Sequence, residues 1–269
     1  MIVKTWLGLF TLLVTLVGAA HAQPANDFDA PAERELVRLV NDARQKAGLQ
    51  PLAVDERLTQ AARAHSQLLA QHGNLSHQYP GEPPLVERLA ATGLRFDWSA
   101  ENVALDSGTP ADAHRGLMNS PPHRANILNS NLNAIGVGVV RQGGLIYVTE
   151  DFARRGRDYS AKQAEDLAAA TFVKLRHQRG LAPLAKDEPP ALRDAACNMA
   201  REGGLDRPLP PQAGARFVVR YTEPEPDKLP SEAARLASNP TLKRFAVGAC
   251  YDTSEKYPGG TWWMVMVFY

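Results

Sequence analysis

Two short segments recur in the same order in both halves of the chain, and this repetition constrains the fold more than any other sequence feature. Residues 47–56 (AGLQPLAVDE) match residues 179–188 (RGLAPLAKDE), and residues 134–138 (AIGVG) match residues 246–250 (AVGAC). A chance match of residues that flank turns is the alternative. The shared order, with similar flanking elements, favours a duplication. The sequence therefore predicts two units of similar architecture, the second a degenerate copy of the first.

Hydrophobic periodicity predicts the secondary structure of the first unit. Helical spacing of apolar residues, bounded by capping residues, begins near Pro31, Asp55, Leu85 and Thr109. Strand-like runs cover residues 102–105, 135–140 and 145–152, with a hairpin turn over residues 141–144. Helices and antiparallel strands in this order predict an α+β fold in which helices cover a sheet.

Composition and motifs exclude several classes of function. The chain of 269 residues has a formal net charge of +1 and no basic run with interleaved aromatic residues, so nucleic acid is not an expected partner. It contains no phosphate loop, no Gly-x-Ser-x-Gly elbow and no His-Glu-x-x-His zinc motif. The sequence thus supplies no standard catalytic motif.

The first 22 residues have the features of a secretory signal peptide. Lys4 precedes an apolar run over residues 6–17, and Ala20-His21-Ala22 is a small-x-small cleavage site. The apolar run is too short for a membrane span, so no transmembrane segment is expected after cleavage. We expect a secreted or periplasmic protein with a first unit over residues 23–158 and a second over residues 159–269.

The two cysteines, Cys197 and Cys250, both lie in the second unit. Disulfides persist in the compartments that exported proteins reach, so an even pair in such a chain favours one bridge. Two buried free thiols are the alternative.

Three polar residues of the first unit are candidate site residues: His77, Glu101 and His123. Pro121 and Pro122 precede His123, which predicts that this imidazole stands on a rigid turn. Two imidazoles and a carboxylate are a reasonable ligand set for Zn²⁺ with an open position, and they also suit other divalent ions. The same trio could instead form a purely structural hydrogen-bonded cluster, or take part in catalysis.

Other candidates have simpler interpretations. His65 lies on an apolar helix stripe and is expected to be a hydrogen-bonded core residue, whereas His114 is expected on a solvated helix face. Nucleophilic catalysis would have to use a serine beside a histidine, for which the candidates are Ser66, Ser76 and Ser120. The second unit has no histidine after His177, so a scaffolding or partner-binding role is expected for it.

A series of motifs resembles one known family. The segments are residues 39–44 (LVNDAR), 48–52 (GLQPL), 76–77 (SH), 100–104 (AENVA), 118–128 (MNSPPHRANIL) and 135–138 (IGVG). In this order they resemble the CAP superfamily (cysteine-rich secretory proteins, antigen 5 and pathogenesis-related 1), in its short bacterial branch, over about residues 33–154. The resemblance implies a three-layer α-β-α sandwich with a shallow cleft that His77, Glu101 and His123 line.

The chain departs from the family at one site position. Many eukaryotic members have a second glutamate a few residues before the last histidine, and Ser120 occupies that place here. The resemblance therefore implies a polar triad with Ser120 beside it, in place of a tetrad.

Three functions are compatible with these features. The first is a non-enzymatic binding module whose ligand is a lipid, a cell-envelope component or a protein. The second is a metal-dependent, peptidase-like hydrolase in which His77, Glu101 and His123 hold the metal and Glu101 is the general base. The third is a structural envelope protein in which both units form one surface. The absence of a nucleophile motif favours the binding module.

Overall fold

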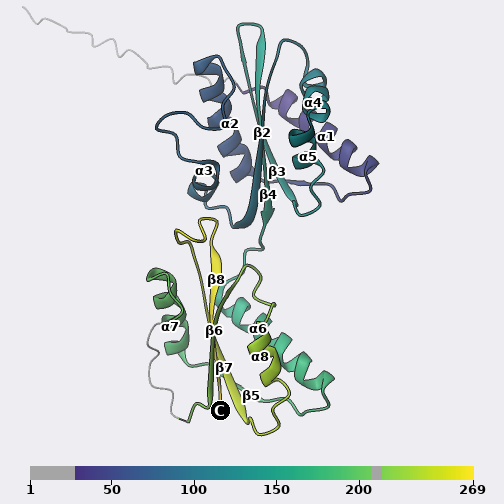
Figure 1. Ribbon diagram of the computed structural model, residues 1–269. Coiled ribbons are helices and arrows are strands. Elements are labelled where there is room, and N and C mark those ends of the chain that lie inside the picture. The colour runs from purple at the N-terminus through teal and green to yellow at the C-terminus, as the bar shows by residue number, and fades with distance from the viewer. Residues whose placement is uncertain (1–27, 207–213) are drawn as a thin grey trace, which may run out of the picture.

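The computed structural model describes residues 28–206 and 214–269, which contain two four-stranded sheets. The signal peptide predicted over residues 1–22 lies outside the described residues. Helices cover both faces of each sheet, so each half of the chain forms three layers (Figure 1). The predicted α+β class and the α-β-α sandwich are therefore confirmed.

The first half contains α1 (Ala30–Lys46), β1 (Ala53–Val54), α2 (Glu56–His72), α3 (Leu85–Ala91), β2 (Phe96–Asp106), α4 (Pro110–Asn119), α5 (Pro121–Ile127), β3 (Ala134–Gln142) and β4 (Leu145–Arg155). Its sheet has the order β1-β3-β4-β2, with β1 parallel to β3 and the other pairs antiparallel. Helices α2 and α3 cover one face, and α1, α4 and α5 cover the other (Figure 1).

The second half contains α6 (Ala161–Gln178), β5 (Ala185–Asp187), α7 (Pro190–Arg201), β6 (Phe217–Glu223), α8 (Ser231–Leu236), β7 (Arg244–Asp252) and β8 (Thr261–Phe268). Its sheet order, β5-β7-β8-β6, and its strand directions repeat those of the first half. Helix α7 lies on one face, and α6 and α8 lie on the other (Figure 1). The second half is therefore a sandwich of the same topology.

Side-chain caps set the helix boundaries that the sequence predicted. The carboxylate of Asp29 accepts a hydrogen bond from Ala32 N at 3.0 Å, and Asp55 accepts one from Arg57 N at 2.9 Å. Thr109 forms a capping box at the start of α4. Each cap satisfies backbone N–H groups that the first turn of a helix leaves without partners.

Two predicted elements differ in the structure. Strand β2 is longer than the predicted run over 102–105, because β4 pairs with it from Phe96 to Asp106 and satisfies backbone groups of its polar residues too. The segment after Pro121 is the helix α5 and not a turn. Proline is tolerated in the first turn of a helix, where its missing N–H removes no hydrogen bond.

A glycine allows α2 to approach β3 closely. A Cβ atom on Gly138 would lie 2.5 Å from the backbone carbonyl carbon of Ala62, which is far inside van der Waals contact. In the second half, a Cβ on Gly248 would lie 2.3 Å from the backbone carbonyl carbon of Leu192 in α7. The predicted match of residues 134–138 with residues 246–250 is therefore wrong by two positions, since Gly138 corresponds to Gly248.

Strand pairing supports the corrected register. Ala53 of β1 pairs with Ala134, whereas the matching Ala185 of β5 pairs with Arg244. A shift of two residues keeps every side chain on its own face of the sheet, so the sequence pattern alone does not distinguish the two alignments.

An ion pair covers the sheet edge that the short β1 leaves open. Arg63 of α2 donates to both carboxylate oxygens of Glu33 in α1, at 2.9 and 2.6 Å. Val139 N in β3 donates to the same carboxylate at 3.4 Å. The corresponding residues in the second half are Glu165, Arg193 and Ala249. In both sheets, the same ion pair thus accepts a hydrogen bond from a backbone N–H at the open edge.

Apolar side chains on both faces of the sheets form the core. Leu36, Leu117 and Val148 belong to the cluster under α1 and α4, while Leu58 and Leu69 of α2 pack on the opposite face. Among the described residues, no helix is long and apolar enough to cross a membrane.

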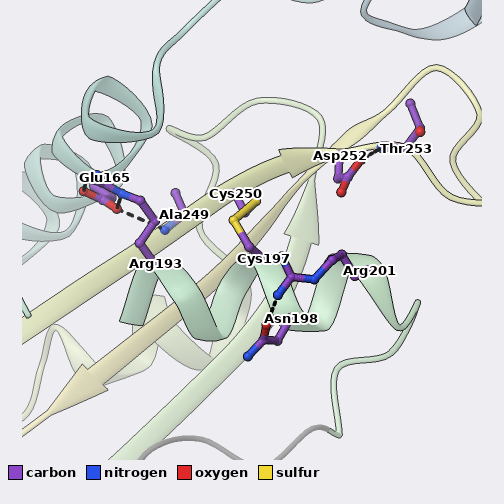
Figure 2. The surroundings of a disulfide bond; sticks show 9 residues. All are labelled: Glu165, Arg193, Cys197, Asn198, Arg201, Ala249, Cys250, Asp252 and Thr253. Atoms are coloured by element: carbon purple, nitrogen blue, oxygen red, sulfur yellow. Dashed lines mark hydrogen bonds and ion pairs between the residues drawn. A yellow bond between two sulfur atoms is a disulfide. The ribbon is translucent and has the colours of Figure 1, made fainter. Parts of the chain in front are cut away.

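The disulfide predicted between Cys197 and Cys250 is present and joins α7 to β7 (Figure 2). Figure 2 also shows Arg193 of α7 paired with Glu165 of α6, so a covalent bond and an ion pair both hold α7.

Substitution of Gly138 tests the close approach of α2 to β3. The variant Gly138→Ala should lose at least about 2 kcal/mol of unfolding free energy, because its Cβ overlaps helix backbone that cannot move cheaply. The matched control Gly116→Ala, in α4 with open space around its Cα, should gain about 0.5–1 kcal/mol. Urea denaturation followed by circular dichroism measures both, and equal stabilities would contradict the packing described here.

Removal of the disulfide tests how the second half is stabilised. The bridge closes a loop with a sequence separation of 53, for which chain entropy predicts a contribution of about 4 kcal/mol. The double variant Cys197→Ala/Cys250→Ala should therefore unfold at lower urea concentration in the fluorescence of the buried Trp262 and Trp263. A transition that does not move would show that packing alone holds α7.

Candidate functional site

The structure brings His77 and Glu101 together. Glu101 projects from β2 with its side chain 3% exposed, and its Oε1 lies 2.8 Å from His77 Nδ1. His77 lies in the connection between α2 and α3, with a side chain that is 61% exposed. One nitrogen of an accessible imidazole is therefore held by a buried carboxylate.

Arg88 of α3 is a third member of this group that sequence reasoning missed. Its Nη2 donates to Glu101 Oε2 at 2.6 Å, and its Nη1 lies 3.3 Å from Glu82 Oε1. A guanidinium with a buried side chain thus lies between two buried carboxylates and offsets part of their charge. No motif or spacing marked Arg88, because it stands on a short helix and its partners are distant in sequence.

His65 of α2 is a fourth member of this group. It is fully buried, its Nδ1 lies 2.7 Å from Glu82 Oε1, and its Nε2 lies 2.9 Å from Ser76 O. The prediction of a hydrogen-bonded core histidine is confirmed. Since these contacts tie the loop that carries His77 to α2, the position of His77 depends on His65.

The charges of this group shift the pKa values of the two histidines predicted for the site in opposite directions. The hydrogen bond to Glu101 raises the pKa of His77 above 6.5. Burial alone would raise the pKa of Glu101, but the hydrogen bond from His77 and the charge of Arg88 bring it below its usual value. Burial, and then the charge of His77, lower the pKa of His123. At any pH near neutral His77 is therefore the more protonated of the two imidazoles.

His123 stands in the first turn of α5. Its backbone carbonyl accepts a hydrogen bond from Asn102 Nδ2 at 3.3 Å, and Asn126 Nδ2 donates to Asn102 Oδ1 at 2.9 Å. Ser120 is half-buried, lies between α4 and α5, and makes no capping hydrogen bond with its side chain. Helix α5 is therefore fastened to β2 through backbone groups and amides, which leaves the imidazole of His123 free.

Zinc binding by His77, Glu101 and His123 stays a prediction. The described residues contain no group of three His, Cys, Asp or Glu side chains placed to hold an ion. The reason lies at Glu101, where the guanidinium of Arg88 occupies one oxygen and His77 the other. A cation beside this carboxylate would be repelled by Arg88, so the group neutralises itself without one.

Two of the three candidate nucleophiles, Ser66 and Ser76, are engaged elsewhere. Ser66 is fully buried, with its hydroxyl 2.8 Å from Gly138 O and 2.9 Å from Thr149 Oγ1. The Ser76 hydroxyl donates to Gln78 O at 2.6 Å. These serines hold backbone in place and are not paired with an imidazole nitrogen.

Two buried carboxyls in β4 were also missed. Glu150 accepts a hydrogen bond from Asn102 Nδ2 at 3.1 Å, and burial raises the pKa of Glu150 to about 7. Asp151 lies opposite Glu101 in the sheet, and burial, then the charge of Glu101, raise the pKa of Asp151 well above its usual value. Two adjacent acidic residues within an apolar strand were the sequence signal for them.

A groove of about 420 Å³ opens on the other face of the sandwich, between α1, α4 and α5. Its lining includes the apolar side chains of Leu39, Met118 and Leu128. His114 lines it as well, is 9% exposed, and its Nδ1 has no hydrogen-bond partner among the described residues. The predicted position of His114 on a solvated helix face is therefore wrong, because α4 packs this side toward α1. Burial lowers the pKa of His114, which keeps it neutral.

Comparison with known proteins matches the first half of the chain to one family. Residues 37–152 match the model of CAP, the cysteine-rich secretory protein family. This part of the chain is similar to the CAP family and is named the CAP domain. Protein YkwD of Bacillus subtilis (strain 168) is 39% identical over 113 residues, which are 42% of this chain and 44% of that protein.

Two solved structures resemble the same part of the chain. An extracellular protein containing an SCP domain from Bacillus anthracis is 29% identical, with a TM-score of 0.43, and the match covers 46% of this chain and 40% of that one. A cysteine-rich secretory protein from Staphylococcus aureus is 22% identical, with a TM-score of 0.38, over 46% and 39%. The match to each of these three relatives spans less than half of the relative's own length.

Titration of the two histidines tests the charge separation in the CAP domain. By NMR, His77 should titrate above pH 6.5 and His123 below it. Stability from the His77–Glu101 pair is then fully present below the unfolded pKa of about 6.5 and is lost as pH rises through the raised folded value. Glu101→Gln should lower the midpoint of His77, whereas Glu87→Gln, an exposed neighbour on α3, should leave it unchanged. A midpoint of His77 that does not respond to Glu101→Gln would contradict the pairing.

Proposed function

We propose that the CAP domain is an exported, non-enzymatic module that binds an amphiphile, a molecule with an apolar chain and an acidic group, in the groove between α1, α4 and α5. The observation that carries this proposal is the imidazole of His114, which lines the groove and whose buried Nδ1 has no hydrogen-bond partner among the described residues. A buried polar atom without a partner costs about 1–3 kcal/mol, and a ligand that hydrogen-bonds to it recovers part of that energy.

The chemistry of the groove selects the ligand class. Leu39, Met118 and Leu128 offer apolar surface, which favours a hydrocarbon chain. Lys46 and Arg124 contribute two positive charges to the lining, against one negative charge from Asp42. A neutral imidazole can donate to a carboxylate oxygen, so an acidic head group suits this end of the groove. Of the ligands considered from the sequence, a lipid fits best.

The hydrolase hypothesis has less support. It requires a metal at His77, Glu101 and His123, and the carboxylate of Glu101 is already neutralised by Arg88 and His77. It would otherwise require a serine nucleophile, and Ser66 and Ser76 donate their hydroxyl protons elsewhere. Ligand contact by His77, Glu101, His123 and Ser120 remains a separate prediction, which the same binding experiment tests.

Export of the protein rests on three features. The sequence predicts a signal peptide over residues 1–22, and the structure contains a disulfide, which persists in oxidising compartments. The relative from Bacillus anthracis is an extracellular protein. A secreted or periplasmic module that carries an envelope lipid accounts for these features together.

Fatty-acid binding tests the proposal. Palmitate should bind the mature protein, with one site per chain by isothermal titration calorimetry. His114→Leu should weaken binding about tenfold through loss of its hydrogen bond, and Met118→Trp should weaken it further by filling the groove. The matched control His177→Leu, on the exposed surface of α6, should bind as the wild type does.

Two outcomes would contradict this function. Equal affinity of the wild type, His114→Leu and Met118→Trp would place palmitate outside the groove. Loss of binding in His77→Ala with none in His114→Leu would instead assign the ligand to the predicted His/Glu site.

A further inference from the structure

A hydrogen bond and a cation–π contact join the CAP domain to the second half of the chain, at a place that we name the junction. Phe96 N, at the start of β2, donates to Gly259 O at 3.1 Å. The guanidinium of Arg95 lies 4.1 Å from the ring centroid of Tyr251 in β7, within range of a cation–π interaction. A Cβ on Gly259 would lie 2.2 Å from Phe96 O, so only glycine permits this contact. The two halves are therefore held in fixed contact here.

A cavity of about 180 Å³ lies at this junction. Cations outnumber carboxylates in its lining, with Arg95, Arg154, Arg155, Arg157 and Lys228 against Asp97 and Glu225. Its walls come from the ends of β2 and β4, the connection after β4, and the connection between β6 and α8. Residues of both halves therefore form one positively charged hollow.

Three of these cations are already paired. Arg154 binds both carboxylate oxygens of Asp97, at 2.5 and 2.7 Å. The Nη1 of Arg155 lies 2.8 Å from Asp55, and the Nε of Arg95 lies 3.6 Å from Asp158. These pairs fix the walls of the cavity and contribute little net charge.

Arg157 and Lys228 differ from these three cations in their pairing. Within the described ranges neither belongs to an ion pair, and both are exposed. Arg157 Nη1 donates a hydrogen bond to the Tyr159 hydroxyl at 3.4 Å. Both lower the pKa of the half-buried Glu225, so their charges act on the same part of the cavity. Burial, and then the charge of Asp227, outweigh them and raise the pKa of Glu225. The two cations thus leave room for an anion from outside.

A second, more apolar hollow of about 220 Å³ adjoins the first. The two share the wall formed by Phe96, Asp97, Pro224 and Gly260. Val86, Tyr257 and Pro258 supply further apolar surface on the far side. Ligand sites at domain interfaces commonly combine such apolar walls with a few convergent polar groups.

We propose that this junction is a binding site for a small organic anion with an apolar group, whose anionic group lies between Arg157 and Lys228 and whose apolar group lies against Phe96 and Tyr257. The site needs both halves of the chain, which gives the second half a function although it lacks the histidines of the CAP domain. It is separate from the groove between α1, α4 and α5, and it does not depend on the function proposed for that groove.

The probe 8-anilinonaphthalene-1-sulfonate tests this site, because it joins a sulfonate to aromatic rings. Titrated into the ¹⁵N-labelled mature chain, it should shift the amide resonances of Gly156, Gly259 and Gly260. Arg157→Glu and Lys228→Glu should each weaken binding about tenfold, because each reverses a charge beside the sulfonate. Lys174→Glu, an equal charge change on the exposed side of α6, should leave the affinity unchanged. The uncharged analogue N-phenyl-1-naphthylamine should bind more weakly than the sulfonate.

Three results would overturn the proposal. The first is a set of amide shifts confined to α1, α4 and α5, which would place the probe in the other groove. The second is wild-type affinity in both charge-reversal variants, each with an unchanged circular dichroism spectrum. The third is equal affinity for the sulfonate and its uncharged analogue.

Discussion

A buried arginine organises the framework on which the CAP domain depends. Arg44 of α1 is 1% exposed, and its guanidinium donates to Gln50 O, Ile127 O, Asn129 O and Leu132 O at 2.8–3.3 Å. It therefore satisfies the carbonyl groups of two loops that no strand or helix would otherwise pair. These loops lead into β1 and out of α5, so one side chain fixes both the short parallel strand and the helix that carries His123. Arg176 has the same role in the second half, where it binds Ala182 O and Asn239 O.

The polar cluster of the CAP domain follows from the need to neutralise buried charge. Glu101 and Glu82 are carboxylates with almost no exposed surface, and they are stable there because Arg88 and the histidines surround them. Burial, and then the charge of Glu101, raise the pKa of Asp151 beside it, and the charge of Arg88 only partly opposes this. This self-contained charge balance explains why the cluster positions loops well and offers little to a metal ion. The exposed side chain of His77 stays accessible for contact with a ligand.

Sequence reasoning was reliable where short-range chemistry decides the outcome. Capping residues such as Asp55 and Thr109 identified helix starts, and the two cysteines of an exported chain identified their bridge. The predictions failed where the position of a side chain depends on a partner that is distant in sequence. The position of His114 depends on α1 packing against α4, and the partners of Glu101 depend on where α3 lies. The register of the repeat was missed by two residues, since such a shift preserves the alternation of faces along β7.

The amino-acid sequence by itself determined the α+β class, the repeated topology, the disulfide and the family of the first half. Those properties follow from local periodicity, capping residues and ordered motifs, which are all present in short segments of the sequence. Only the tertiary structure decided that Arg88 donates a hydrogen bond to Glu101. It also decided that His114, whose Nδ1 has no partner among the described residues, lines a groove, and that cations of both halves lie at one junction. Each of these depends on side chains far apart in sequence, and their distances are set by packing of the sheets and helices as a whole.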